Sequence, residues 1–119
     1  MRHSSFQTIL GLLILGMGAM ACENKNSSPS QDPASAAFVK GRTIYQTQCM
    51  ACHHADPHKA GSLGPDVFGS SKELLKARIM HAAYPDGYSP KRTTKIMAPL
   101  PHLENEIEAL HTFLNQEAH

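Results

Sequence analysis

Cys49, Cys52 and His53 bring two thiols and an imidazole together in the stretch Cys49-Met50-Ala51-Cys52-His53. A thiol forms covalent links or, once ionised, binds a metal, and a neutral imidazole nitrogen is a common metal ligand. Groups of this kind at this spacing indicate a site for a metal or a metal-containing cofactor. A redox-active dithiol is another chemistry open to the two cysteines, but it would need a βαβ context that the sequence does not offer.

The order Cys-x-x-Cys-His is the attachment pattern of a c-type haem. The two thiols can add to the two vinyl groups of the porphyrin as thioethers, and the adjacent imidazole then reaches the iron. We therefore predict one covalent haem c, bound by Cys49 and Cys52 and ligated by His53. Zinc is the alternative, because His54 and His58 could complete a cramped Cys2His2 set.

Residues 1–21 have the pattern of a secretory signal peptide: a weakly positive start, an apolar run and small residues toward the end. A single membrane anchor is the alternative, although the apolar run is short for one. Cleavage after Ala21 would leave Cys22 as an odd thiol in an oxidising compartment. The segment 19–22 resembles a bacterial lipobox, which implies a lipid on Cys22 and a membrane-tethered protein in the periplasm.

Residues 22–35 contain no large apolar side chain and are predicted to be a flexible tether. The folded domain is then expected at 36–119, a size at which a core made of polypeptide alone is marginal. A net charge of +1 argues against nucleic acid as a partner. Several cations nevertheless gather in mid-chain, either as solvated faces or as a docking surface for an acidic partner. These are Lys72, Lys76, Arg78, Lys91, Arg92 and Lys95.

Apolar spacing predicts helices at about 36–48, 71–83 and 104–116, and no strand pattern is present. The second helix is expected to begin with a capping box from Ser70 to Glu73. Glycines and prolines predict a wrapping loop at 54–69 and an extended strap at 93–102. The expected fold is all-α, with three to four short helices around one haem.

Three separated motifs carry a resemblance to a known family. They are Gly41 and Tyr45 with Leu110 and Phe113-Leu114, then Gly64-Pro65-Asp66, and finally Lys95-Ile96-Met97-Ala98-Pro99. With the haem motif, they make residues 36–116 similar to a class I cytochrome c. The resemblance implies that the terminal helices cross closely, that the Pro65 carbonyl accepts a hydrogen bond from His53, and that Met97 is the second axial ligand of the iron.

Other side chains compete for these roles. His81 or His102 could replace Met97 and give a bis-His haem, whereas Met50 sits inside the haem motif and Met80 is expected to pack in the core. Some of Tyr84, Tyr88 and Arg92 could bind the haem propionates, the alternative being ordinary packing and solvent contact.

Axial ligation by histidine and methionine leaves no open coordination position for a substrate. The expected function is therefore single-electron transfer between redox proteins, without an enzymatic activity or a small-molecule substrate of its own, alone or as a subunit of a redox complex. The alternative is a haem sensor or enzyme subunit whose sixth ligand can be displaced.

Overall fold

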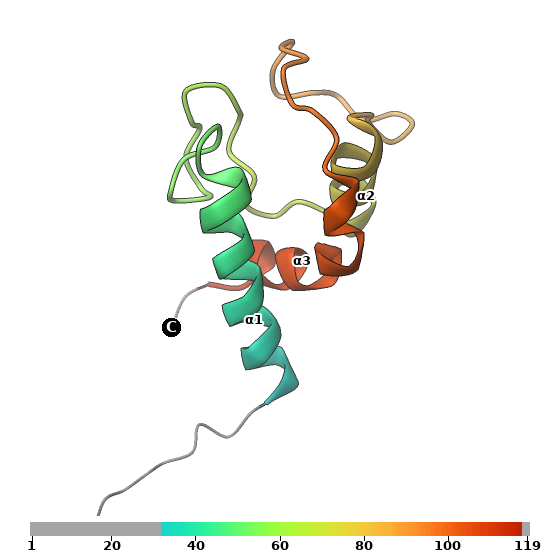
Figure 1. Ribbon diagram of the computed structural model, residues 1–119. Coiled ribbons are helices and arrows are strands. Elements are labelled where there is room, and N and C mark those ends of the chain that lie inside the picture. Colours follow the sequence, from blue (N-terminus) through green and yellow to red (C-terminus); the bar gives the residue numbers. More distant parts are fainter. Residues whose placement is uncertain (1–31, 118–119) are drawn as a thin grey trace, which may run out of the picture.

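The computed structural model describes residues 32–117 and is shown in Figure 1. The α-helices are α1 (Pro33–Ile44), α2 (Lys72–His81) and α3 (Ile107–Asn115). No strand is present among the described residues, which confirms the all-α prediction. The predicted signal peptide, Cys22 and most of the predicted tether lie outside the described residues. None of the helices in 32–117 is long and apolar enough to cross a membrane.

Helix α1 begins earlier than the apolar pattern indicated. The Asp32 side chain accepts a hydrogen bond of 3.2 Å from the Ala34 amide, and Pro33 fits the first helical position because it has no N–H to satisfy. Residues 33–35, predicted as tether, are therefore helical. At its other end the helix continues as one π-helical turn, Tyr45–Cys49, which brings the chain to the first cysteine as predicted.

Helices α1 and α3 cross at Gly41, as the resemblance implied (Figure 1). A Cβ at this glycine would lie 2.0 Å from the Ala109 carbonyl oxygen and 2.8 Å from the Cβ of Phe113. The two backbones therefore touch directly. The Phe113 ring packs against Phe38 and Tyr45, with ring centroids 5.4 Å apart in both pairs.

A small apolar core lies beside this crossing. Its buried members come from the π-helical turn after α1, from α2, from the segment before α3 and from α3 itself: Tyr45, Leu75, Ile79, Leu103, Ile107, Leu110 and Leu114. Full burial of one such side chain contributes about 1.5–3 kcal/mol. So few large apolar residues leave a marginal core, in agreement with the expectation that a cofactor adds to it.

Ser71, and not Ser70, caps helix α2. The Ser71 hydroxyl accepts a hydrogen bond of 3.2 Å from the Leu74 amide. The Ser70 hydroxyl is buried and donates to the Val67 carbonyl at 2.6 Å, closing the preceding turn. The predicted capping box from Ser70 to Glu73 was therefore wrong by one position, because Ser70 is already engaged upstream.

The strap predicted at 93–102 is irregular up to residue 100, and its chain continues into a 3-10 helix, Pro101–Glu106, that leads into α3. The predicted helix at 104–116 is therefore divided in two. The Leu100 amide donates to the Ile79 carbonyl at 2.6 Å, which fixes the end of the strap to α2.

Candidate cofactor site

The Cys-x-x-Cys-His motif forms a tight turn at the end of the π-helical segment. The amides of Cys52 and His53 both donate to the Cys49 carbonyl, at 3.2 and 2.9 Å. This turn leaves Cys49 half-buried and Cys52 exposed, and these two described cysteines are not joined in a disulfide. Both thiols are therefore available for attachment to a cofactor beside the imidazole.

The loop after the motif holds His53 in one orientation. Nδ1 of His53 lies 2.8 Å from the Pro65 carbonyl oxygen. Because a carbonyl only accepts, Nδ1 carries the proton, and Nε2 keeps its lone pair for a metal. A Cβ at Gly64 would lie 2.5 Å from Cε1 of this ring, so the loop presses directly against the imidazole. The structure places Pro65 where the resemblance implied.

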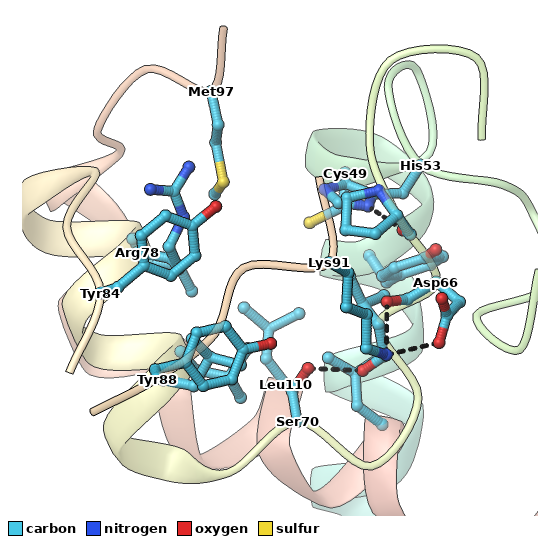
Figure 2. Close-up of a pocket in the computed structure, with 17 residues that line it drawn as sticks. Cys49, His53, Asp66, Ser70, Arg78, Tyr84, Tyr88, Lys91, Met97 and Leu110 are labelled. Carbon is cyan, nitrogen blue, oxygen red and sulfur yellow. Dashed lines mark hydrogen bonds and ion pairs between the residues drawn. The ribbon is translucent and has the colours of Figure 1, made fainter. Parts of the chain in front are cut away.

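A hollow opens between this loop, α2 and the strap (Figure 2). It has two adjoining parts, which share several lining residues. Six residues line both parts: Cys49, His53, Pro65, Arg78, Tyr84 and Met97. Apolar side chains of α2 and α3 form the inner wall of the first part, among them Leu75, Ile79 and Leu110.

Met97 and His53 lie on opposite sides of the hollow in Figure 2. Met97 comes from the strap, His53 from the end of the haem motif, and both line each part of the hollow. The rival ligands His81 and His102 are not among the residues that line either part. Met50 is 42% exposed, and Met80 packs against the core, as expected.

Arg78 is a site residue that the sequence analysis left among the mid-chain cations. It lines both parts of the hollow, and its guanidinium lies 4.3 Å from the centre of the Tyr84 ring. Tyr84 in turn stacks on Tyr88, with ring centroids 5.4 Å apart. The signal was present in the sequence, because Arg78 follows Leu74 and Leu75 at helical spacing, on the apolar stripe of α2.

The Cys49 thiol is kept neutral by its surroundings. Burial, with a smaller contribution from Cys52, raises the pKa of Cys49 to about 11. Burial also raises the pKa of Tyr45 to about 12, and its hydroxyl donates to the His54 carbonyl at 2.6 Å. A neutral thiol is a slow redox nucleophile, so these surroundings do not favour the dithiol alternative.

The two histidines that the zinc alternative would need, His54 and His58, are not placed beside the cysteines as ligands. Nδ1 of His54 accepts a hydrogen bond of 2.9 Å from the Asp56 amide, and His58 stacks on Phe68 at 3.7 Å between ring centroids. Among residues 32–117, no group of three or more histidine, cysteine, aspartate or glutamate side chains is placed to hold a metal ion. The described residues thus contain no preformed site of the Cys2His2 type.

The sequence model of the cytochrome c family matches residues 38–117. The chain belongs to the cytochrome c family. It is a haem protein of the electron-transfer class, and it carries a haem c that is attached covalently. The same comparisons found no match among curated proteins and none among solved structures.

The side chains around the hollow fit a haem. Two thiols and an imidazole stand at one wall, a thioether sulfur stands opposite, and apolar side chains of α2 and α3 form the interior. An apolar wall suits the flat face of a porphyrin. The guanidinium of Arg78 and the hydroxyl groups of Tyr84 and Tyr88 suit its acidic propionate groups. The bound haem supplies a one-electron iron couple.

Proposed function

We propose that the protein is a class I, single-electron carrier with one haem c held by Cys49 and Cys52, and with His53 and Met97 as its axial ligands. The observation that carries this proposal is the position of Met97 and His53 on opposite sides of one hollow (Figure 2). The proton on Nδ1 of His53 points to Pro65, so the other ring nitrogen serves as the ligand.

With both axial positions filled, these side chains hold the iron and exclude exogenous ligands. Thioether ligation by Met97 favours a higher reduction potential than a bis-His pair would. Nothing then remains for substrate chemistry at the metal, so electron exchange at the protein surface is the activity that this arrangement serves.

Exchange is proposed to occur beside Cys52. This cysteine is exposed, and it lines the second part of the hollow together with Leu63 and Ile96, which are 43% and 61% exposed. A haem edge near the surface shortens the distance to a redox partner, and exposed apolar side chains around it allow brief contact. The partners are therefore redox proteins that meet this opening.

Among the mid-chain cations, Lys95 adds charge beside this opening, because it directly precedes Ile96 in the chain. Lys72 and Lys91 form ion pairs with Glu108 and Asp66, which leaves Lys76 and Lys95 as exposed lysines without a recorded ion pair among the described residues. An acidic partner is therefore favoured. Its reaction rate should fall with added salt, and a flat response would contradict this steering.

Tyr84 and Tyr88 are proposed to hydrogen-bond the haem propionates with help from Arg78. All three line the first part of the hollow, and Figure 2 shows both phenol rings facing it. Arg92, the other candidate from the sequence, is less suited, because both terminal nitrogens of its guanidinium donate to carbonyls, those of Gly61 and Ser62, whereas Arg78 uses only one of its two, on the Ala82 carbonyl.

We propose further that residues 1–21 direct export and that a lipid on Cys22 tethers the domain to a membrane in the periplasm. The support is the pattern of the sequence alone. Expression of the full chain and of Cys22→Ala in a bacterium tests this proposal. Release of the variant, but not of the natural chain, from the membrane fraction is expected; equal distribution of the two would contradict it.

The axial ligands are tested by visible spectra of the purified holoprotein, first oxidised, then reduced, then reduced with carbon monoxide. We expect a c-type spectrum with the weak far-red band of a methionine-ligated ferric haem, unchanged by carbon monoxide. Met97→Ala should lose this band and bind carbon monoxide, whereas Met80→Ala should keep the band. Rapid carbon monoxide binding by the natural protein would instead indicate a sensor or enzyme with a displaceable ligand.

A further inference from the structure

We propose that Lys91 and Arg92, which directly precede the strap that carries Met97, form a clip that ties this segment to the loop after His53, and that this clip keeps exogenous ligands away from the iron. The inference rests on the proposed ligation by His53 and Met97. It assigns a positioning role to two residues that the sequence analysis grouped among general surface cations.

The strap needs such a support because its own backbone provides little. The turn before it is closed by the Tyr88 amide on the Pro85 carbonyl at 3.1 Å, and the Leu100 amide bonds to Ile79 after it. Between these points, the backbone N–H and C=O groups of residues 89–99 make no hydrogen bond to other backbone groups in the described part of the chain. Met97 therefore lies in a segment held at its two ends and, between them, by side chains.

Lys91 makes the first of these side-chain connections. Its ammonium donates both to the Asp66 carboxylate and, at 3.2 Å, to the Asp66 backbone carbonyl. Twenty-five residues separate the two partners in sequence. Asp66 directly follows Pro65, whose carbonyl orients His53, so Lys91 reaches the segment that sets the proximal ligand.

Arg92 makes the second connection. Its guanidinium donates to the Gly61 carbonyl at 3.0 Å and to the Ser62 carbonyl at 3.4 Å, across about thirty residues of sequence. The bond to Gly61 is partly buried. A charged donor to a partly buried carbonyl is stronger than a neutral one, and the two nitrogens of a planar fork restrict its orientation.

The loop that receives these bonds is packed tightly against the haem motif. A Cβ at Gly61 would lie 2.4 Å from the Cys52 carbonyl oxygen, and one at Gly64 would meet the His53 ring. The Gly64 amide also donates to the Cys52 carbonyl at 2.9 Å. The loop cannot shift toward the haem motif. The hydrogen bonds from Lys91 and Arg92 to this loop therefore restrain the position of the strap relative to His53.

The two clip residues act on different sides of the hollow. Lys91 lines its first part and Arg92 lines its second part, although they are neighbours in sequence. Displacement of Met97 by an outside ligand requires the strap to move outward, and such movement must break one or both connections. The clip thus adds to the free energy needed to open the sixth coordination position.

The test is imidazole binding to the ferric holoprotein, measured by the loss of the far-red band. Lys91→Met and Arg92→Gln should each raise the affinity for imidazole, by roughly tenfold for the charged, partly buried bond of Arg92. Lys72→Met is the matched control. It removes an ion pair of similar exposure, to Glu108, that joins α2 and α3 away from the strap. Its imidazole affinity should match that of the natural protein.

Denaturant unfolding of the same variants separates positioning from general stability. If Lys72→Met and Lys91→Met lose similar stability but only the latter binds imidazole more tightly, the clip is supported. Unchanged imidazole affinity in both Lys91→Met and Arg92→Gln would overturn the clip. If the far-red band is present in that case, the ligation by Met97 still stands. A natural protein that lacks this band and binds imidazole as tightly as Met97→Ala would instead refute the proposed ligation itself, and the clip with it.

Discussion

Replacement of Gly41 by alanine tests the close crossing of α1 and α3. Within a helix this change alone should stabilise by about 1 kcal/mol, because glycine is the poorer helix former. At the crossing, however, the new Cβ would lie 2.0 Å from the Ala109 carbonyl oxygen, where real Cβ contacts stay beyond 3.0 Å. The helices must therefore separate by at least about 1 Å at this point.

The obstacle is backbone, so no rotamer change can relieve it. Overpacking of a tight contact costs about 1–3 kcal/mol, and a fixed backbone partner places this case at the upper end. After the gain in helix propensity, we expect a net loss of about 2 kcal/mol. For a domain of this size the loss lowers the melting temperature by roughly 8 °C or more.

The assay is denaturant unfolding of the holoprotein, followed by circular dichroism and by haem absorbance, which should give coincident transitions. Val39→Ala is the control, since Val39 lies on the same helix but is 59% exposed, and it should change stability by less than about 0.5 kcal/mol. Gly41→Val should be worse than Gly41→Ala. An alanine variant as stable as the natural protein, or more stable, would refute the described crossing.

Three further changes test other parts of the domain. Gly64→Ala should push the His53 ring off its hydrogen bond, because the new Cβ would meet Cε1 at 2.5 Å; a spectroelectrochemical titration should show a shifted reduction potential. The hydrogen bond from Lys91 holds the pKa of Asp66 below its usual range, so the carboxylate stabilises the fold above its unfolded-state pKa of about 3.9. Asp66→Asn should be the less stable protein at neutral pH, and its difference from the natural protein should vanish in unfolding curves as the pH falls through the lowered pKa. Ser71→Ala should reduce the unfolding free energy by about 1 kcal/mol through loss of the α2 cap, and no change would contradict the assigned cap.

The local parts of the fold could be predicted because local patterns determine them. The spacing of apolar residues placed the helices, and the haem motif was recognised from Cys49, Cys52 and His53 alone. Pro65 and Met97 were named through the family resemblance, and the structure brings both to the hollow. Their roles as orienting group and axial ligand remain predictions.

The remaining features depend on contacts that no short window of sequence contains. Ser70 and Ser71 are equivalent as caps until the turn at Val67 engages one of them. Lys91 and Arg92 look like solvated cations until the loop some 25 to 31 residues upstream supplies their acceptors. Tertiary contacts therefore determine which serine caps α2 and which carbonyls Lys91 and Arg92 bind, and helix propensity and charge patterns do not.

The crossing of α1 with α3 also imposes an order of events on the chain during its production. Synthesis begins at the N-terminus, so the cysteines emerge well before α3, which is the last helix to appear. Until then Gly41 and Tyr45 lack the partners that bury them, and pairing of such distant segments is intrinsically slow. Closure of the domain therefore waits for its last helix, whatever the earlier segments have already formed. A chain truncated before residue 107 would leave Gly41 and Tyr45 without Ala109 and Phe113.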